Sequence, residues 1–196
     1  MSRRKDLFDW IAPLYGLFYS LQKSNYRRIL QQNIRKLNIK SCASVLDVGC
    51  GTGAFCSALQ EMGFQVTGID TSQKMLQVAR RKNHTSGIVF LQGSVLTGLP
   101  FEDGGYDCVL ASYVAHGFTA EDRAVMYREM NRVSRDLVLI HDFNQKSSSL
   151  IRWIEALEKS DYDNFLKYGE DEMRQYFKTV QIMDVSSRAA WMVGRK

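Results

Sequence analysis

A glycine-rich turn that directly follows an apolar strand constrains this chain more than any other feature. Residues 45–53 read Val-Leu-Asp-Val-Gly-Cys-Gly-Thr-Gly. Glycine has no Cβ, so these positions let the backbone turn sharply and approach a ligand closely. A helical pattern follows from residue 53, which completes a strand–turn–helix unit. This unit predicts an α/β fold whose ligand lies beyond the carboxyl end of the strand.

Short apolar strands alternate with amphipathic helices along the rest of the chain. We predict helices at residues 53–62, 72–82, 120–132 and 148–159, with Thr71 or Ser72 and Thr119 as N-caps. Strands are predicted at residues 44–48, 65–69, 88–91, 107–111, 137–141, 180–185 and 189–193. The pattern predicts a three-layer α/β sandwich with a seven-stranded, mostly parallel sheet and an antiparallel edge hairpin.

The first 40 residues carry nine basic and two acidic residues, an excess that the rest of the chain lacks. Apolar residues from Leu7 to Leu21 fall at helical spacing, and a basic helix is predicted to continue over residues 26–37. Asp6, Asp9 and Pro13 interrupt the stretch and argue against a signal peptide. We predict an N-terminal helical lid at 1–40 and a ligand-binding region at 41–196, within one structural domain. The basic residues form either a solvated helix face or a surface for an anionic partner.

The cysteines indicate where the chain resides. Cys42, Cys50, Cys56 and Cys108 form no C-x-x-C pair and suggest no disulfide framework. No run is long and apolar enough to cross a bilayer. We therefore expect a reduced, cytoplasmic protein without a transmembrane segment.

Two carboxylates near the turn indicate which ligand it holds. Asp70 ends the second strand 21 residues after Gly49, a spacing that suits a carboxylate accepting both hydroxyls of a ribose. The glycines also meet the loose dinucleotide fingerprint, so an NAD-type oxidoreductase is an alternative. Asp47 weighs against it, because this carboxylate would oppose a pyrophosphate at the turn. S-adenosylmethionine has no phosphate and carries an ammonium and a sulfonium, so Asp47 suits that ligand.

Several further segments extend the pattern in the same order. Residues 45–53 resemble the first motif of class I S-adenosylmethionine-dependent methyltransferases of the type 11-like group, and later segments resemble the following motifs: 66–76, 93–94 with 99–101, 106–109, and 129–140. Residues 8–15 resemble the start of ubiquinone/menaquinone-type small-molecule methyltransferases. The resemblance covers about residues 40 to 145. It implies a Rossmann-like fold, S-adenosylmethionine as cofactor with S-adenosylhomocysteine as product, and in-line methyl transfer to a small molecule.

The resemblance also assigns cofactor contacts by position. It places the methionine part of the cofactor against Asp47, Gly49, Cys50 and Gly51. Asp70 is implied to hold the ribose, and the other implied contacts are Thr71, Ser72, Met75, Ser94, Val95 and Ser112. Ser94 stands where the family more commonly has an acid. A neutral hydrogen bond to the adenine amino group is weaker than a charge-assisted one, which predicts modest affinity.

The end of the fourth predicted strand, residues 111–116, is expected to face the transferring methyl group. His116 is the first candidate for a general base, and His141 and Asp142 at the end of the fifth predicted strand are second. Tyr113, three residues before His116, is a further candidate for a catalytic residue. A base is needed only where the acceptor must lose a proton. Each histidine has a structural alternative, a hydrogen bond to a neighbouring loop. We predict no metal site, because His141-Asp142-x-Asn144 is not a complete ligand set.

The acceptor class follows from what the chain lacks and from its aromatic opening. Enzymes that methylate amino groups of nucleic-acid bases resemble one another in two adjacent prolines after the fourth strand, and cytosine-C5 enzymes in a Pro-Cys pair. This chain has neither pattern, so nucleic acid is a less favoured acceptor. Aromatic residues between Phe8 and Tyr19 predict an apolar lid over a small or lipid-like acceptor, or a helix that only packs on the core. A peripheral membrane contact stays open. A non-catalytic protein that binds S-adenosylmethionine is a third alternative.

Overall fold

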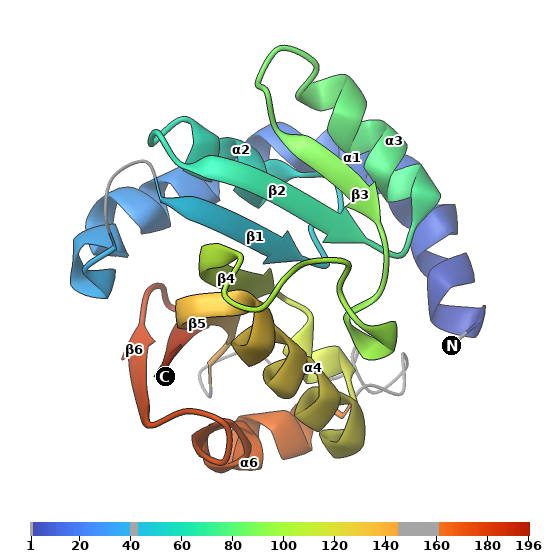
Figure 1. The fold of residues 1–196 in the computed structure, drawn as a ribbon. Helices are drawn as coiled ribbons and strands as arrows, with labels where there is room; N and C mark the ends of the chain where they lie inside the picture. Colours follow the sequence, from blue (N-terminus) through green and yellow to red (C-terminus); the bar gives the residue numbers. More distant parts are fainter. Residues whose placement is uncertain (1, 40–42, 145–160) are drawn as a thin grey trace. The chain divides into compact units, whose positions relative to one another are not determined.

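The computed structural model describes residues 2–39, 43–144 and 161–196, and the side chains of its first helix from Phe18 onward. The chain divides into two compact units, residues 1–97 and 98–196 (Figure 1). The predicted helix at 148–159 lies outside the described residues. Each unit is a group of strands with its own helices.

The first unit holds the glycine turn. Its strands lie in the order β3-β2-β1 and are all parallel. Apolar side chains make β1 the buried strand of this unit, with Val45, Leu46 and Val48 at most 3% exposed. Its elements in chain order are α1 (Ser2–Asn33), the 3-10 helix η1 (Ile34–Leu37), β1 (Ser44–Val48), α2 (Ala54–Gln60), β2 (Gln65–Asp70), α3 (Gln73–Lys82), β3 (Val89–Gln92) and η2 (Val95–Thr97).

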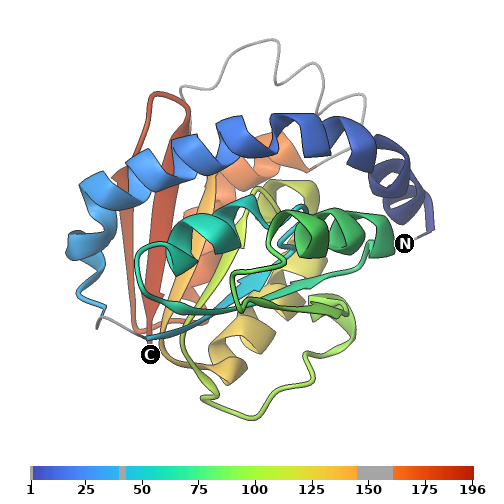
Figure 2. The same ribbon diagram turned by 90° about the horizontal axis from the view of Figure 1, so that it is seen from above.

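Helix α1 runs through Pro13, in agreement with the helical spacing of the apolar residues from Leu7 to Leu21. A proline inside a helix removes one backbone hydrogen bond, so contacts elsewhere must stabilise the helix. Figure 2 shows α1 lying along α2 and α3. Its second half is fixed there: the Tyr26 ring stacks on Phe55 with centroids 4.4 Å apart, and the Tyr19 hydroxyl donates to Asn83 Oδ1 over 3.0 Å.

The basic residues of α1 are partly engaged in ion pairs. Lys23 Nζ lies 2.6 Å from a carboxylate oxygen of Glu61, and Arg27 pairs with the other oxygen of the same group. These two cations therefore help to hold α1 against the end of α2. The prediction of a purely solvated basic face does not apply to them.

The second unit combines a parallel and an antiparallel part. Its strand order is β4-β5-β7-β6, in which β4 and β5 are parallel and β7 pairs antiparallel with both neighbours. The apolar residues of β4 and β5 and one face of α4 form its core. Its elements are β4 (Tyr106–Ser112), the 3-10 helix η3 (Ala115–Gly117), α4 (Ala120–Val133), β5 (Ser134–Phe143), α6 (Tyr162–Arg174), β6 (Thr179–Asp184) and β7 (Ala189–Arg195).

The predicted fold class is confirmed. The described residues hold seven strands, mostly parallel and flanked by helices, with an antiparallel pair at one edge. Two predicted N-caps also form: the Ser72 hydroxyl accepts from the Met75 N–H over 3.1 Å, and the Thr119 hydroxyl accepts from the Asp122 N–H over 3.2 Å. Helix α6 was not predicted from the sequence.

Within the part of the chain that the structure describes, no helix is both long enough and apolar enough to span a membrane.

Candidate active site

The glycine turn of the first unit is tied to the neighbouring strand. The backbone N–H groups of Gly49 and Cys50 both donate to the Ile69 carbonyl, over 2.8 and 3.1 Å. Gly49, Gly51 and Gly53 have φ values of 72°, 52° and 75°, a region that other residues rarely adopt. The turn therefore requires glycine at all three positions for conformational reasons alone.

Gly51 and Gly53 differ in how much space surrounds the position where a Cβ would lie. A Cβ added to Gly53 would lie 2.8 Å from the Phe90 ring, so this glycine allows the helix to pack closely on the sheet. A Cβ added to Gly51 would meet no heavy atom within 4 Å. The backbone at Gly51 thus borders open space, as a ligand-binding turn requires.

Asp70 links the end of β2 to this turn. One carboxylate oxygen accepts from the Gly51 N–H and the other from the Ser72 N–H, each over 2.8 Å. An ionised carboxylate has about four acceptor sites, so both oxygens keep capacity for further donors. The geometry fits a carboxylate that accepts from two adjacent hydroxyls while it fixes the turn.

Asp47 is a carboxylate buried beneath the turn, with 1% of its surface exposed. Its Oδ2 accepts from the Cys56 thiol over 3.1 Å, whereas Oδ1 has no hydrogen-bond partner among the described residues. Burial raises the pKa of Asp47 to about 7; the Cys56 hydrogen bond lowers it and the Asp70 charge raises it further. A buried carboxylate with an unsatisfied oxygen is costly unless a donor or a cation compensates it.

The side chain of Cys50 packs against β2. A Cβ on Gly68 would lie 2.8 Å from the Cys50 sulfur, which shows how closely the thiol approaches that strand. The hydrogen bond with Cys56 lowers the pKa of Cys50, but burial and the Asp70 and Asp47 carboxylates raise it to about 11. Cys50 is therefore a neutral thiol, and its backbone is the part that belongs to the turn.

The residues expected near the adenosine lie around the end of β2. Met75 is buried at the start of α3, and Thr71 is exposed. The Asp70 carbonyl accepts from the Gly93 N–H over 3.0 Å, which attaches the next segment to the same strand end. There the Ser94 hydroxyl accepts from the Leu96 N–H over 3.2 Å, and Val95 is buried. Except for Ser112, the first unit brings together every residue that the sequence assigned to the cofactor.

The end of β4 in the second unit has an unusual backbone. Ser112 is the last residue of the strand, and Tyr113 follows with φ of 54°. A bulky residue in this conformation is strained, and such strain clusters at functional sites. The Tyr113 N–H donates to the His141 carbonyl over 2.8 Å, and its ring lies 5.1 Å from the His141 ring and 4.8 Å from Phe143, centroid to centroid.

His116 has a carboxylate partner that the sequence did not reveal. Its Nδ1 lies 2.7 Å from Asp142 Oδ1, and its backbone N–H donates to Asp142 Oδ2 over 3.3 Å. The Phe143 N–H also donates to Asp142, over 2.8 Å. Both side chains are buried, His116 at 8% and Asp142 at 2% exposed. The carboxylate therefore orients the imidazole.

His141 is in a different environment. It is fully buried, and the Trp191 indole N–H donates to its Nδ1 over 2.8 Å. Burial lowers the pKa of His141 to about 4, although the Asp142 charge raises it slightly. His141 is therefore neutral at physiological pH, and its Nδ1 lone pair is already used.

Sequence reasoning also missed Arg123, a fully buried arginine on α4. It pairs with Glu172 at 2.6 Å and Asp161 at 2.9 Å, and it donates to the Phe118 carbonyl over 2.5 Å. Arg123 thereby joins the segment after His116 to α6. A signal was present: Arg123 lies on the face of α4 shared by Met126, Tyr127 and Met130, where a charged residue must find partners.

The described residues contain no cluster of three or more histidine, cysteine, aspartate or glutamate side chains suited to hold a metal ion.

Comparison with known proteins matches residues 45–136 to a methyltransferase domain. The ubiquinone/menaquinone biosynthesis C-methyltransferase of Hahella chejuensis is 30% identical over 155 residues, which cover 74% of this chain and 61% of that protein. The demethylmenaquinone methyltransferase of Chlorobaculum tepidum is 33% identical over 138 residues, covering 67% and 55%. The chain is thus similar to the class I S-adenosylmethionine-dependent methyltransferases. It spans 61% or less of the length of these two relatives.

A solved structure agrees with the fold of this chain. A crystal structure from Methanococcus maripaludis, of a protein assigned to the S-adenosylmethionine-dependent methyltransferases, superposes with a TM-score of 0.76. It covers 96% of this chain and 93% of the other at 20% identity. At this identity the likeness supports the fold.

The glycine turn fits S-adenosylmethionine, the methyl donor of the enzymes to which the chain is similar. The open space at Gly51 leaves room for a ligand against the backbone. Asp70 suits the ribose hydroxyls, and the unsatisfied buried oxygen of Asp47 suits the cationic methionine part, directly or through water. A pyrophosphate would place two negative charges near the same carboxylate.

Proposed function

We propose that this chain transfers the methyl group of S-adenosylmethionine to a small-molecule acceptor that carries an acidic hydroxyl. The buried Asp47 carboxylate with one unsatisfied oxygen is the observation that carries the proposal, because it favours a cationic ligand over a dinucleotide. The cofactor, when bound, would supply an electrophilic methyl group on its sulfonium sulfur. The thioether that remains is a good leaving group, so no acid is needed. The protein has two remaining tasks, to orient the acceptor and to remove its proton.

His116 is the proposed general base. A hydrogen bond from Nδ1–H to Asp142 leaves the proton-accepting lone pair on Nε2. In the proposed step, Nε2 takes the proton of the acceptor hydroxyl and the electron pair stays on the acceptor. That pair would make the acceptor oxygen, or the ring carbon to which it delocalises, the nucleophile for the methyl group that S-adenosylmethionine would supply. The sulfur would keep the electron pair of the carbon–sulfur bond, and a methylated ring carbon would lose its hydrogen as a proton. Asp142 stabilises the resulting imidazolium as a positioning residue.

His141 and Tyr113 are assigned positioning parts. The neutral state of His141 and its engaged Nδ1 favour His116 as the base. Burial, together with the Asp142 charge, raises the pKa of Tyr113 to about 12, so its hydroxyl is suited to donate a hydrogen bond rather than to lose its proton.

The surroundings of His116 support an apolar, flat acceptor. The Phe143 and Tyr162 rings lie 4.9 and 6.1 Å from the His116 ring, and Tyr113 lies 6.5 Å away, centroid to centroid. Aromatic side chains favour flat ring ligands through stacked and edge-to-face contacts. The names of the two curated relatives point to quinone-type substrates, so we propose a hydroquinone or phenol as the acceptor class.

The lid and the cytoplasmic location belong to the same proposal. The proposed lid comprises residues 1–40, and the second half of its helix α1 is anchored on α2 and α3. Free thiols at Cys50, Cys56 and Cys108 suit a reducing compartment.

The test is a methyl-transfer assay with isotope-labelled S-adenosylmethionine and a panel of hydroquinones and phenols. We expect label in one class of product, and its loss in His116→Gln with binding of the cofactor retained. Binding that depends on Asp70 together with no methylated product from any acceptor would favour the non-catalytic alternative. Binding of NAD in place of S-adenosylmethionine would favour the oxidoreductase.

A further inference from the structure

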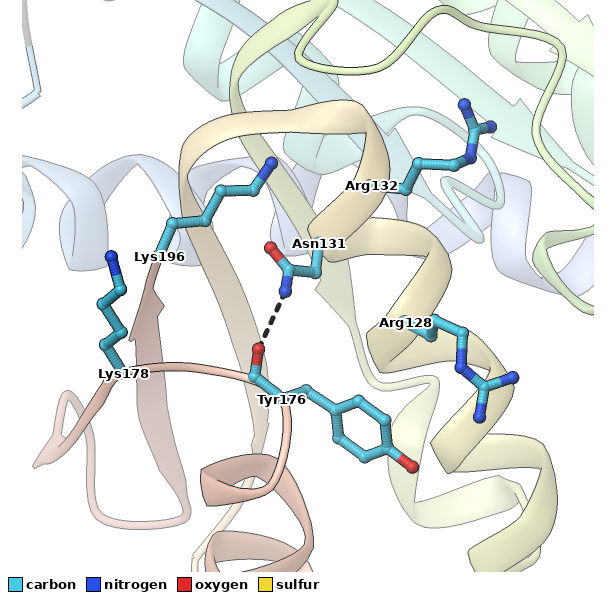
Figure 3. Close-up of a pocket in the computed structure, with 6 residues that line it drawn as sticks. All are labelled: Arg128, Asn131, Arg132, Tyr176, Lys178 and Lys196. Carbon is cyan, nitrogen blue, oxygen red and sulfur yellow. Dashed lines mark hydrogen bonds between the residues drawn. The ribbon is translucent and has the colours of Figure 1, made fainter.

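A cavity lies on the second unit, away from the histidines. Its volume is about 400 Å³, which is within the range of small-ligand pockets. None of its lining side chains is acidic and four are basic (Figure 3): Arg128, Asn131, Arg132, Tyr176, Lys178 and Lys196. They come from the last turns of α4, the segment between α6 and β6, and the residue after β7.

The cations of this pocket differ from neighbouring ones in their pairing. Three nearby surface arginines each pair with a carboxylate: Arg135 with Asp107, Arg174 with Glu170, and Arg195 with Asp136. In the pocket only Arg132 does so, with Glu129 and Asp103. Among the described residues, no carboxylate pairs with the other three, which are Arg128, Lys178 and Lys196.

The pocket is held in shape by hydrogen bonds. Asn131 Nδ2 donates to the Tyr176 carbonyl over 2.8 Å, and Lys196 Nζ donates to the Ser134 carbonyl over 2.5 Å. Asn131 Oδ1 is buried and has no hydrogen-bond partner among the described residues. In Figure 3 this oxygen points to the side of Lys178 and Lys196, and the two arginines extend on the other side of Asn131. The pocket therefore offers both positive charge and an unsatisfied acceptor.

We propose that this pocket binds a phosphate group of an anionic ligand. Phosphate oxygens would neutralise the unpaired cations, and a hydroxyl of the phosphate or of its alcohol would donate to Asn131 Oδ1. The group belongs either to a soluble phosphate compound or to a phospholipid headgroup, which share this chemistry. The site is separate from His141, because the pocket contacts Ser134 at the opposite end of β5, about 20 Å away along the strand.

The experiment compares two charge-matched double variants with the wild type. Arg128→Glu with Lys178→Glu reverses two exposed pocket cations. Lys167→Glu with Arg174→Glu makes the same charge change on α6, outside the pocket. Binding is measured at about 0.15 M salt, where long-range attraction is largely screened. The probes are inorganic phosphate and pyrophosphate by calorimetry, and vesicles of phosphatidylcholine with or without phosphatidylglycerol by sedimentation. Binding of S-adenosylmethionine reports whether each variant is folded.

We expect saturable binding to at least one probe, reduced tenfold or more by the pocket variant and less than twofold by the control. Binding to phosphate or pyrophosphate would assign a soluble ligand, and binding only to phosphatidylglycerol vesicles would assign a headgroup. An equal loss of probe binding in both variants would show that binding depends only on general charge attraction, and this would overturn the proposal. Absence of binding to all probes would overturn it as well.

Discussion

His116 Nδ1 and Asp142 Oδ1 lie 2.7 Å apart, although 26 residues separate them in the sequence. The pair joins the segment after β4 to the end of β5, and the Asp142 oxygens also accept two backbone N–H groups. Asp142 is thus held by two backbone N–H groups, of His116 and Phe143, as well as by the imidazole. This arrangement makes the orientation of the imidazole a property of the fold.

Replacing Asp142 tests this pair. Asp142→Asn keeps the shape of the side chain but presents a donor to the imidazole, so the wrong tautomer is favoured. We expect kcat to fall by about two to four orders of magnitude with little change in the affinity for S-adenosylmethionine. His84→Gln, at an exposed histidine, is the control. Unchanged kcat, or an unchanged pH profile of kcat, in Asp142→Asn would show that the pair has no part in proton transfer.

Gly51→Ala separates ligand space from backbone strain. Both Gly51 and Gly63 have positive φ and open space for a Cβ, so alanine at either position costs about 1 kcal/mol or more of strain. Only the Gly51 methyl group would occupy the space assigned to the cofactor. We expect similar losses of thermal stability in Gly51→Ala and Gly63→Ala, but a loss of S-adenosylmethionine affinity of tenfold or more in the first alone. Equal affinities in the two variants would contradict the assignment of Gly51.

Asp47 makes the stability of the apo protein depend on pH. Its pKa is raised from 3.8 to about 7, so the folded state binds the proton more tightly than the unfolded state does. The contribution of Asp47 to the stability of the protein is therefore most favourable below about pH 4, and it becomes less favourable as the pH rises to about 7. At 1.36 kcal/mol per pKa unit, the loss amounts to about 4 kcal/mol.

Asp47→Asn should remove this dependence. We expect the variant to be more stable than the wild type at pH 8 and to bind S-adenosylmethionine more weakly. Urea unfolding of both proteins at pH 5 and pH 8 measures the difference, and Glu102→Gln, at an exposed carboxylate, is the control. A variant that is less stable than the wild type at pH 8 would refute the prediction.

His141 makes the stability of the protein depend on pH in the opposite direction. Its pKa is lowered from 6.5 to about 4, so the unfolded state binds the proton more tightly. The contribution to stability is complete above about pH 6.5 and is lost as the pH falls through about 4. An NMR titration of the histidine ring protons should find one histidine that stays neutral down to about pH 4 in wild type and shifts in Trp191→Phe. Titration of all three histidines near their usual pKa would contradict the buried environment.

The elements that sequence analysis predicted are those with local signals. Strand–turn–helix units have short apolar runs and nearby caps, so Ser72 and Thr119 could be recognised from neighbours three residues away. The glycine turn and Asp70 follow from spacing within one βαβ unit.

What sequence analysis missed depends on contacts between distant segments. The pairing of His116 with Asp142 and of Arg123 with Glu172 spans 26 and 49 residues. The helical spacing of its apolar residues predicted α1, but the contacts that hold its second half, Tyr26 with Phe55 and Lys23 with Glu61, join segments that are far apart in the sequence. Helix α6 was not predicted although Asp161, at its start, is a residue type common at N-caps; in the structure this carboxylate pairs with Arg123 instead of capping the helix.

Calorimetric titration with S-adenosylmethionine is the most direct test of whether the glycine turn and Asp70 bind this cofactor. We use wild type and Asp70→Ala, with NAD as the control ligand. We predict saturable binding of S-adenosylmethionine to the wild type, at least a hundredfold weaker binding to Asp70→Ala, and no binding of NAD to either protein. Binding of NAD in preference to S-adenosylmethionine, or affinity for S-adenosylmethionine that does not depend on Asp70, would contradict it.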